Sequence, residues 1–126
     1  MKKTKKTIMA VDDEENILEL VKSILEEHNY SVITARDGDE CIRKLKKEKP
    51  DLILLDMMMP GMSGREVCER IRKNPNTKGL KIAFLTVARF SDMGKETLAK
   101  MKVSDYITKP FENADLVKRV KKILGN

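Results

Sequence analysis

The sequence has few cysteines and no long apolar run. It contains two cysteines among 126 residues, and their spacing fits neither a disulfide framework nor a zinc site. We therefore expect Cys41 and Cys68 to be small hydrophobic residues on helix faces, in a reducing compartment. No apolar stretch approaches the roughly 20 residues of a membrane span, and residues 8–11 are too short a run for a signal peptide. These absences predict a soluble cytoplasmic protein.

Aromatic residues are also scarce, which affects how the positive charge is interpreted. They make up 4% of the chain, and the formal net charge is +6. Four positive charges lie in a basic N-terminal tail, residues 1–6, so residues 7–126 carry a net charge of +2, six minus four. No aromatic residues alternate with the lysines to stack on bases, so direct nucleic-acid binding is disfavoured.

The length and composition predict one domain. A chain of 126 residues, of which 40% are hydrophobic and 37% charged, can bury a sizeable core but has no room for a second domain. No linker, internal repeat or low-complexity segment occurs outside the basic tail. We therefore assign residues 7–126 to a single domain.

Five segments have the character of strands. Residues 8–11, 52–55 and 82–85 are short continuous apolar runs, which is typical of strands covered on both faces of a parallel sheet. Residues 30–35 and 104–108 mix polar and apolar side chains, which suits strands at the two edges of the sheet.

Helical patterns lie between and after these strands. Apolar residues recur at spacings of three and four within 17–28, 41–45 and 116–124. Ser63 and Glu66 have the spacing of a capping box and predict the start of another helix. A weaker pattern covers residues 91–101. Five alternating β and α segments predict an α/β fold with a parallel sheet and helices on both faces.

Polar residues follow the strands where each one ends. Asp12 and Asp13 come after the first apolar run, Asp56 after the third strand, Thr86 after the fourth and Lys109 after the fifth. The carboxyl ends of parallel strands meet at one edge of a sheet, where ligands bind in open α/β folds. We expect these five residues to converge on one crevice.

The three carboxylates predict a metal ion. Two carboxylates about 4 Å apart repel by about 4 kcal/mol at an effective dielectric constant of about 20. An all-oxygen cluster without His or Cys suits Mg²⁺, or Mn²⁺, which often shares its shell with a phosphoryl oxygen. With the metal bound, Asp56 is a plausible nucleophile for a phosphoryl group, Thr86 a hydrogen-bond donor to it and Lys109 a positive charge beside it.

Each residue alone also has an ordinary structural explanation. Asp13 could cap the first helix, and Asp56 could cap the turn before Pro60. Thr86 could be a strand residue and Lys109 a solvated lysine. An unpaired carboxylate directly after four buried apolar residues would be costly, however, and the combination at one sheet edge favours a site.

Four stretches of the sequence, 11–14, 55–64, 85–86 and 105–111, resemble the motifs of receiver domains in two-component response regulators, including single-domain receivers of the chemotaxis type. The resemblance extends from about residue 7 to residue 124. It implies a doubly wound, flavodoxin-like fold with five strands in the order 2-1-3-4-5.

The resemblance also assigns roles at the crevice. It implies that Asp56 is phosphorylated by a sensor histidine kinase, a phosphotransfer protein or a small phosphodonor. Asp12 and Asp13 match the acidic metal pair, and the backbone carbonyl of Met58 matches a third protein ligand. The bond between Lys109 and Pro110 matches one that is usually cis in the family.

The same resemblance implies a switch. Thr86 and Tyr106 match a pair in which the threonine moves toward the phosphoryl group and the tyrosine turns inward. The output face is then formed by the fourth helix, the fifth strand and the fifth helix, with the surface change centred on residues 91–101. Asp105 and Arg119 resemble residues of a dimerisation face. The downstream target cannot be identified from the sequence.

Three residues beside the crevice differ from the commonest family pattern. Val87 is larger than the usual residue after the switch threonine. Met58 and Ala88 offer no carboxylate or amide to position an attacking water. We hypothesise slow hydrolysis of the phosphoryl-aspartate.

Two other functions fit parts of the pattern. A haloacid dehalogenase-type phosphatase would have a second aspartate at the position of Met58, and an FMN-binding flavodoxin would not place Asp12 and Asp13 against a phosphate. We therefore expect no enzyme that turns over a substrate, only a domain that promotes its own phosphorylation and dephosphorylation. The chain reads either as a stand-alone switch or as the receiver of a longer regulator.

Overall fold

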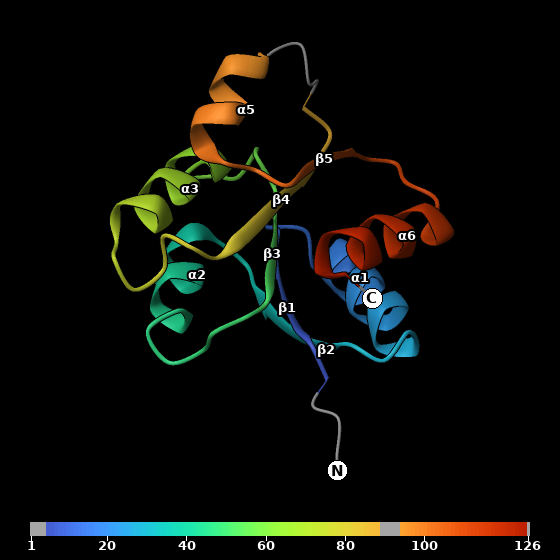
Figure 1. Cartoon of the computed structure of the whole chain (residues 1–126). Coiled ribbons are helices and arrows are strands. Elements are labelled where there is room, and N and C mark those ends of the chain that lie inside the picture. The colour runs from blue at the N-terminus through green and yellow to red at the C-terminus, as the bar shows by residue number, and fades with distance from the viewer. Residues whose placement is uncertain (1–4, 89–93, 126) are drawn as a thin grey trace.

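The apolar runs of the sequence become strands that helices cover on both faces (Figure 1). A computed structural model describes residues 5–88 and 94–125. The strands are β1 (Thr7–Val11), β2 (Ser31–Ala35), β3 (Leu52–Leu55), β4 (Lys81–Thr86) and β5 (Asp105–Thr108). The helices are α1 (Glu15–Glu27), α2 (Gly38–Lys44), α3 (Gly64–Lys73), α5 (Lys95–Met101) and α6 (Asn113–Leu124).

The sheet has the predicted topology. Its five strands are parallel and lie in the order β2-β1-β3-β4-β5. The two segments of mixed polarity, β2 and β5, form the edges, as predicted from their composition. Val11, at the end of β1, is level with Ala35 of β2 and Leu55 of β3. The residues that follow these strands therefore start from the same edge of the sheet.

Alternate side chains of the central strands feed two cores. Ile8 and Ala10 of β1 point into a cluster with residues of α1 and α6. Met9 and Val11 point the other way, into a cluster with residues of α2, α3 and α5. Figure 1 shows the same division, with α1 and α6 on one side of the sheet and α2 and α3 on the other. This two-sided burial explains why the central strands are continuously apolar.

Local signals start and stop several helices. The Ser63 hydroxyl accepts a hydrogen bond from the backbone N–H of Glu66 (3.2 Å), which confirms the predicted cap of α3. Gly125 ends α6 with a φ of +76°, a conformation that glycine adopts without strain. The helical pattern within 17–28 counted His28 on its apolar face, and this detail is wrong: His28 is an exposed residue that ends α1, and Leu18 is buried instead.

Some predictions fall outside the described residues. Residues 1–4 of the basic tail and residues 91–93 of the weakest helical pattern belong to this group. The described part of that pattern is helical from Lys95 to Met101. None of the helices in residues 5–88 and 94–125 is both long enough and apolar enough to cross a membrane.

Both cysteines lie in the core, as predicted. Cys41 of α2 and Cys68 of α3 are fully buried and have free thiols. Burial raises the pKa of the Cys41 thiol to about 12, and it also raises the pKa of Cys68. Neither thiol is therefore a reactive nucleophile near neutral pH.

Candidate functional site

The backbone carries the two key aspartates just beyond the ends of the central strands. The N–H of Asp12 donates to the carbonyl of Ala35 (3.1 Å), and the N–H of Asp56 donates to the carbonyl of Val11 (2.9 Å). Asp12 therefore extends the pairing of β1 with β2 by one residue, and Asp56 extends the pairing of β3 with β1 by one residue. Asp12 and Asp56 are 3% and 4% exposed as whole residues, so both carboxylates are buried.

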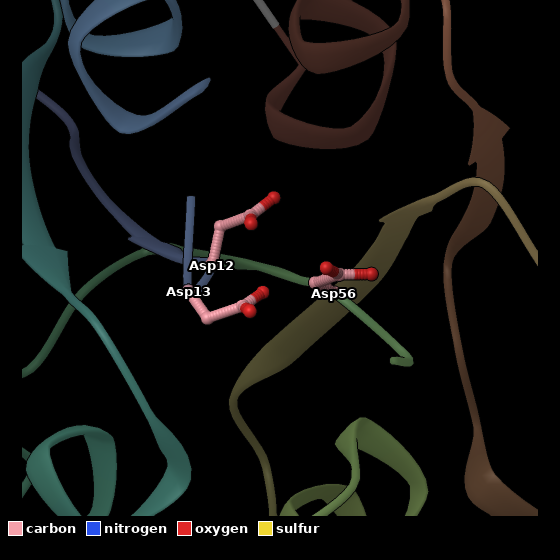
Figure 2. Close-up of side chains that lie close together, drawn as sticks. All are labelled: Asp12, Asp13 and Asp56. Atoms are coloured by element: carbon pink, nitrogen blue, oxygen red, sulfur yellow. The ribbon is translucent and has the colours of Figure 1, made fainter. Parts of the chain in front are cut away.

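Three carboxylates form the acidic cluster that the sequence predicted. Oxygen atoms of Asp12, Asp13 and Asp56 all lie within 4.8 Å of one another. Figure 2 shows Asp12 and Asp13 on the segment after β1, with Asp56 beside them at the end of β3. Asp13 is exposed, whereas the other two are buried. The cluster is therefore open to solvent on the Asp13 side.

Lys109 is the cation of this cluster. Its Nζ donates to Asp12 Oδ2 (2.8 Å), lies 3.6 Å from Asp56 Oδ2 and 3.9 Å from Glu14 Oε1. Burial alone would lower the pKa of Lys109, but the hydrogen bond to Asp12 and the negative charges of Asp56, Asp12 and Glu14 raise it. Lys109 is therefore a permanent positive charge against the Asp56 carboxylate.

Local hydrogen bonds test whether Asp13 caps a helix and Asp56 caps a turn. Glu14, not Asp13, occupies the N-cap position of α1, so Asp13 is not a helix cap. The Glu14 N–H donates to Asp12 Oδ1 (2.9 Å), and the Met58 N–H donates to Asp56 Oδ1 (3.2 Å). Asp56 therefore does hold its own turn through one oxygen. Its other oxygen faces Lys109.

Gly64 holds the loop after Asp56 against α3, and sequence reasoning missed this. Its N–H donates to the carbonyl of Met57 (2.9 Å). A Cβ at this position would lie 2.1 Å from the carbonyl oxygen of Asp56 and 2.7 Å from Cα of Met57. No side chain fits there, so the first residue of α3 must be glycine. The available signals were its position directly after a capping serine and at the end of the stretch 55–64 that resembles a receiver motif.

Thr86 and Tyr106 meet at the backbone of Ala88. The Thr86 hydroxyl is completely buried and accepts from the N–H of Ala88 (3.2 Å). The Tyr106 hydroxyl donates to the carbonyl of Ala88 (2.6 Å). The Tyr106 ring is partly buried and packs 6.0 Å from the Phe84 ring. The two residues are therefore connected through one residue, whose role sequence reasoning did not anticipate.

Asp105 and Arg119 lie outside this crevice. Arg119 Nη1 on α6 donates to both carboxylate oxygens of Asp105 on β5 (3.0 and 3.1 Å), and its Nε donates to Asp115 (2.9 Å). The hydrogen bond that Arg119 donates to Asp115 raises the pKa of Arg119, burial opposes this, and Asp105 adds to the rise. The pair is an intramolecular tie between β5 and α6.

Two exposed apolar side chains follow the strands that carry Asp56 and Thr86. Met58 is 58% exposed and Val87 is 59% exposed. Both lie in the segments that the sequence marked as unusual. They add no carboxylate or amide at these two positions.

The donor atoms of the cluster fit a hard divalent cation. The candidate ligands are carboxylate oxygens, without sulfur or imidazole, and the crevice is open on one side, as Mg²⁺ sites that retain waters require. Two buried acids against one lysine also leave negative charge that a cation would offset.

The peptide bond between Lys109 and Pro110 is cis, as the resemblance implied.

Comparisons with known proteins point to one family. The family model described as "response regulator receiver domain" matches residues 8–121, a range that includes every residue of the cluster. Alkaline phosphatase synthesis transcriptional regulatory protein PhoP of Bacillus subtilis (strain 168) is 41% identical over 119 residues. The match covers 94% of this chain and 48% of PhoP, so the chain spans about half the length of this curated relative.

Solved structures agree with this comparison. Chemotaxis protein CheY4 of Vibrio cholerae is 30% identical, with a TM-score of 0.89 over 96% of this chain and 100% of that chain. Response regulator TrrA of Thermotoga maritima, solved in complex with Mg²⁺-BeF, is 39% identical, with a TM-score of 0.81 over 94% of this chain and 99% of that chain. Both similarities extend over nearly the whole fold.

Proposed function

Because the chain belongs to the family of response regulator receiver domains, we propose that it is a two-component signalling switch whose phosphoacceptor is Asp56. The observation that carries this proposal is one buried carboxylate, 3.6 Å from Lys109 Nζ and within 4.8 Å of two further acids, Asp12 and Asp13. The donor is a sensor histidine kinase, a phosphotransfer protein or a small phosphodonor. The domain promotes only its own phosphorylation and dephosphorylation.

The chemistry is transfer of a phosphoryl group to a carboxylate. An oxygen of Asp56 forms a bond to phosphorus while phosphorus separates from the donor atom, an imidazole nitrogen of a phosphohistidine or a carboxylate oxygen of acetyl phosphate. Asp12, Asp13, Asp56 and the backbone carbonyl of Met58 would hold Mg²⁺ or Mn²⁺, which supplies positive charge beside the transferring group when bound.

Lys109 contributes a second positive charge. Its hydrogen bond to Asp12 orients the ammonium group, and its Nζ already lies 3.6 Å from Asp56. Negative charge accumulates on the phosphoryl oxygens during transfer, and a cation fixed in advance stabilises it without reorganisation. Lys109 therefore favours both the transfer and the phosphorylated state.

The switch begins at Thr86. In the structure its hydroxyl accepts a hydrogen bond from Ala88, but the hydroxyl proton is available to a phosphoryl oxygen. Movement of Thr86 toward that oxygen would release the Ala88 N–H, and the carbonyl of Ala88 holds the Tyr106 hydroxyl. Phosphorylation thereby favours a different arrangement of Tyr106 through one shared residue.

The output face is formed by α5, β5 and α6. Tyr106 lies on β5, and the tie between Arg119 and Asp105 joins β5 to α6, so a change at Tyr106 reaches both elements. This face binds a downstream protein, and on phosphorylation a second copy through Asp105 and Arg119. The relative PhoP is named as a transcriptional regulatory protein, which supports an effector coupled to this domain. A cytoplasmic location agrees with two free thiols.

The exposed residues Met58 and Val87 beside the site support a long-lived phosphorylated state. Met58 and Val87 are both more than half exposed and are apolar, so they offer no group that would position a water for attack on phosphorus. Met58→Asn should shorten the half-life of the phosphoryl-aspartate several-fold, measured as the decay of the phosphorylated mass. An unchanged half-life would exclude this part of the proposal.

Intact mass spectrometry tests the central claim. The protein is incubated with acetyl phosphate and Mg²⁺, in parallel with Asp56→Asn and with a sample containing EDTA. We expect a stoichiometric phosphoryl adduct in the wild type and none in either control. A folded wild-type protein without the adduct, or an equal adduct on Asp56→Asn, would refute the assignment.

A further inference from the structure

One arginine of α3 ties together the segments around the C-terminal end of α5. We propose that Arg72 is a positioning residue that fixes this end of α5, so that switching at Thr86 displaces mainly the other end. The inference rests on the proposed function, which makes α5 part of the output face. It narrows the phosphorylation-sensitive surface to the start of that helix.

The evidence is a set of four hydrogen bonds from a single guanidinium group. Arg72 Nε donates to the carbonyl of Met101 (2.9 Å), and Nη2 donates to the carbonyl of Lys102 (3.0 Å). Nη1 donates to the carbonyls of Lys78 (2.9 Å) and Leu80 (2.6 Å). The first two carbonyls end α5, and the other two belong to the connection between α3 and β4.

A guanidinium group suits this position. The last carbonyls of a helix have no partners within the helix, and Met101 and Lys102 carry two of them. Arginine presents five N–H donors in a planar fork, whereas the ammonium group of lysine is a compact point charge with three. Hydrogen bonds to a charged donor are also stronger than those between neutral groups. Arg72 therefore joins α3 and the connection that follows it, 6 and 8 positions away, to the end of α5, 29 and 30 positions away.

Further contacts hold the same end of α5. The side chain of Met101 is buried. Cys68 lies one turn before Arg72 on α3, and its Sγ is 3.9 Å from the Met101 carbonyl. Lys102 closes the helix in a left-handed conformation, with a φ of +55°, and its N–H donates to the carbonyl of Ala99 (3.1 Å). This end is both packed and hydrogen-bonded.

Within residues 5–88 and 94–125, no side chain from another element forms a comparable hydrogen bond to the beginning of α5. Its N-cap is Gly94, which has a φ of +80° and no side chain to accept a hydrogen bond from the first turn. The hydrogen bond described for this turn is local, from the Leu98 N–H to the Gly94 carbonyl (3.3 Å), and the Leu98 side chain packs in the core that α3 also lines. Figure 1 shows α5 beside α3, at the outer edge of the structure. The two ends of the helix are therefore held unequally.

Arg72 also connects α5 to the strand that carries the switch. The carbonyl of Leu80 is immediately before β4, and β4 ends at Thr86. The C-terminal end of α5 is thereby fastened to the start of β4, whereas Thr86 and Ala88 lie at the other end of that strand. Because the tether lies at the start of β4, a movement at the other end of that strand displaces mainly the Gly94 end of α5, and the helix pivots about Met101 and Lys102.

Amide hydrogen exchange measured by NMR tests this arrangement. Lys102 and Val103 report the tethered end, since their N–H groups donate to Ala99 and Leu98, and the N–H of Leu98 reports the free end. The variants are Arg72→Ala, Arg72→Lys and, as a matched control, Arg70→Ala. Arg70 lies on the same helix and pairs with Glu66 at the surface. Each protein is measured alone and with Mg²⁺ and BeF₃⁻.

In the protein without ligand, Arg72→Ala should accelerate exchange at Lys102 and Val103 by about tenfold or more, because several hydrogen bonds to a charged group are lost. Arg72→Lys should give an intermediate rate, and Arg70→Ala should leave the rate unchanged. Wild-type rates at both amides in Arg72→Ala would overturn the tether. Full restoration by lysine would overturn the role of the guanidinium fork.

The response to BeF₃⁻ tests the pivot. In the wild type, exchange should change several-fold at Leu98 and by less than about twofold at Lys102 and Val103. In Arg72→Ala, both ends should change. Equal changes at both ends of the wild-type helix would refute the pivot. A wild type that gains no phosphoryl adduct from acetyl phosphate would count against the proposed function instead. The exchange rates without ligand would still decide whether Arg72 tethers α5.

Discussion

Lys109 and Arg119 each pair with two aspartates, but the two ion clusters lie in different surroundings. The side chains of Lys109, Asp12 and Asp56 are 4–6% exposed, whereas those of Arg119, Asp105 and Asp115 are 29–48% exposed. Geometry alone does not separate them, since the shortest N–O distances are 2.8 and 2.9 Å. The two clusters differ in their access to water.

This difference predicts different roles. Removing one partner of a buried ion pair leaves an uncompensated charge, and the loss is large. Water and salt ions compete with an exposed ion pair, so the pair contributes little stability and its members can bind other charged groups instead. The buried cluster is suited to fixed chemistry at Asp56. The exposed cluster is suited to contact with another molecule.

Loss of the lysine in the buried cluster should have the largest effect. In Lys109→Met, we expect the free energy of unfolding at pH 7 in EDTA to fall by about 3 kcal/mol, because Asp12 and Asp56 lose their cation. The rate of phosphorylation by acetyl phosphate should fall about 100-fold. Urea denaturation and intact mass measure the two effects. The exposed Lys47→Met is the control, and a stability within about 1 kcal/mol of wild type would contradict the comparison.

Removing one acid from the site should have the opposite effect on stability. Asp13 is exposed, so its repulsion of Asp12 and Asp56 is partly screened, and Asp13→Asn should stabilise the metal-free protein by about 1 kcal/mol. The increase in melting temperature on addition of Mg²⁺ should shrink in the same variant. Thermal unfolding in EDTA and in Mg²⁺ measures both, with the exposed Glu19→Gln as control. A destabilised variant that retains the full response to Mg²⁺ would contradict the metal assignment.

The exposed cluster should contribute much less to stability. Arg119→Ala should lower the free energy of unfolding by less than about 1 kcal/mol, and the difference should shrink in 1 M NaCl as salt screens the pair. The phosphoryl adduct should be unaffected. If Arg119 belongs to a dimer face, light scattering in BeF₃⁻ will show a dimer in the wild type and a monomer in the variant. A loss above about 2 kcal/mol would mean that exposure does not separate the clusters.

Glu40 is an intermediate case, with a side chain 25% exposed. The hydrogen bond from the Arg36 N–H (2.6 Å) lowers its pKa, burial opposes this, and Lys44 at 3.3 Å lowers it further. A lowered pKa stabilises the fold above the unfolded value of about 4.3, and this stabilisation disappears as the pH falls through the folded pKa. Glu40→Gln should therefore lose less than about 1 kcal/mol at pH 7, with a smaller loss near pH 3.

Urea denaturation at the two pH values measures this smallest effect. The exposed Glu19→Gln serves again as the control, because it changes the same kind of group without the partners that Arg36 and Lys44 provide. A loss from Glu40→Gln that grows as the pH falls would contradict the direction of the pKa shift.

The sequence was sufficient for the parts of this structure that depend on element order. Five alternating β and α segments bring strand ends to one edge of the sheet, so Asp12, Asp56 and Lys109 could be expected to meet. The mixed polarity of β2 and β5 identified these two strands as the edges of the sheet. These inferences require only periodicity and chain order, and the structure confirms them.

What could not be predicted depends on backbone groups that side-chain patterns do not reveal. The close approach of Gly64 to the Asp56 carbonyl, the four carbonyls around Arg72 and the double use of Ala88 are all contacts with main-chain atoms. Arg72 lies among many basic residues and has no distinguishing neighbour in the sequence. Only the packing of α3 against α5 gives it a role.

The ion pair between Lys109 and Asp12 has a further consequence for the timing of folding. Its partners are 97 positions apart, and Asp12 meets Asp56 only after β1 pairs with β3, a contact that spans α1, β2 and α2. Contacts so distant in sequence form late, because the loops that separate them must close first. A chain that has not yet emerged as far as Lys109 therefore has aspartates but no assembled acceptor. If Asp56 is the phosphoacceptor, as proposed, its phosphorylation would report two events, the input from the kinase and the completed folding of the receiver.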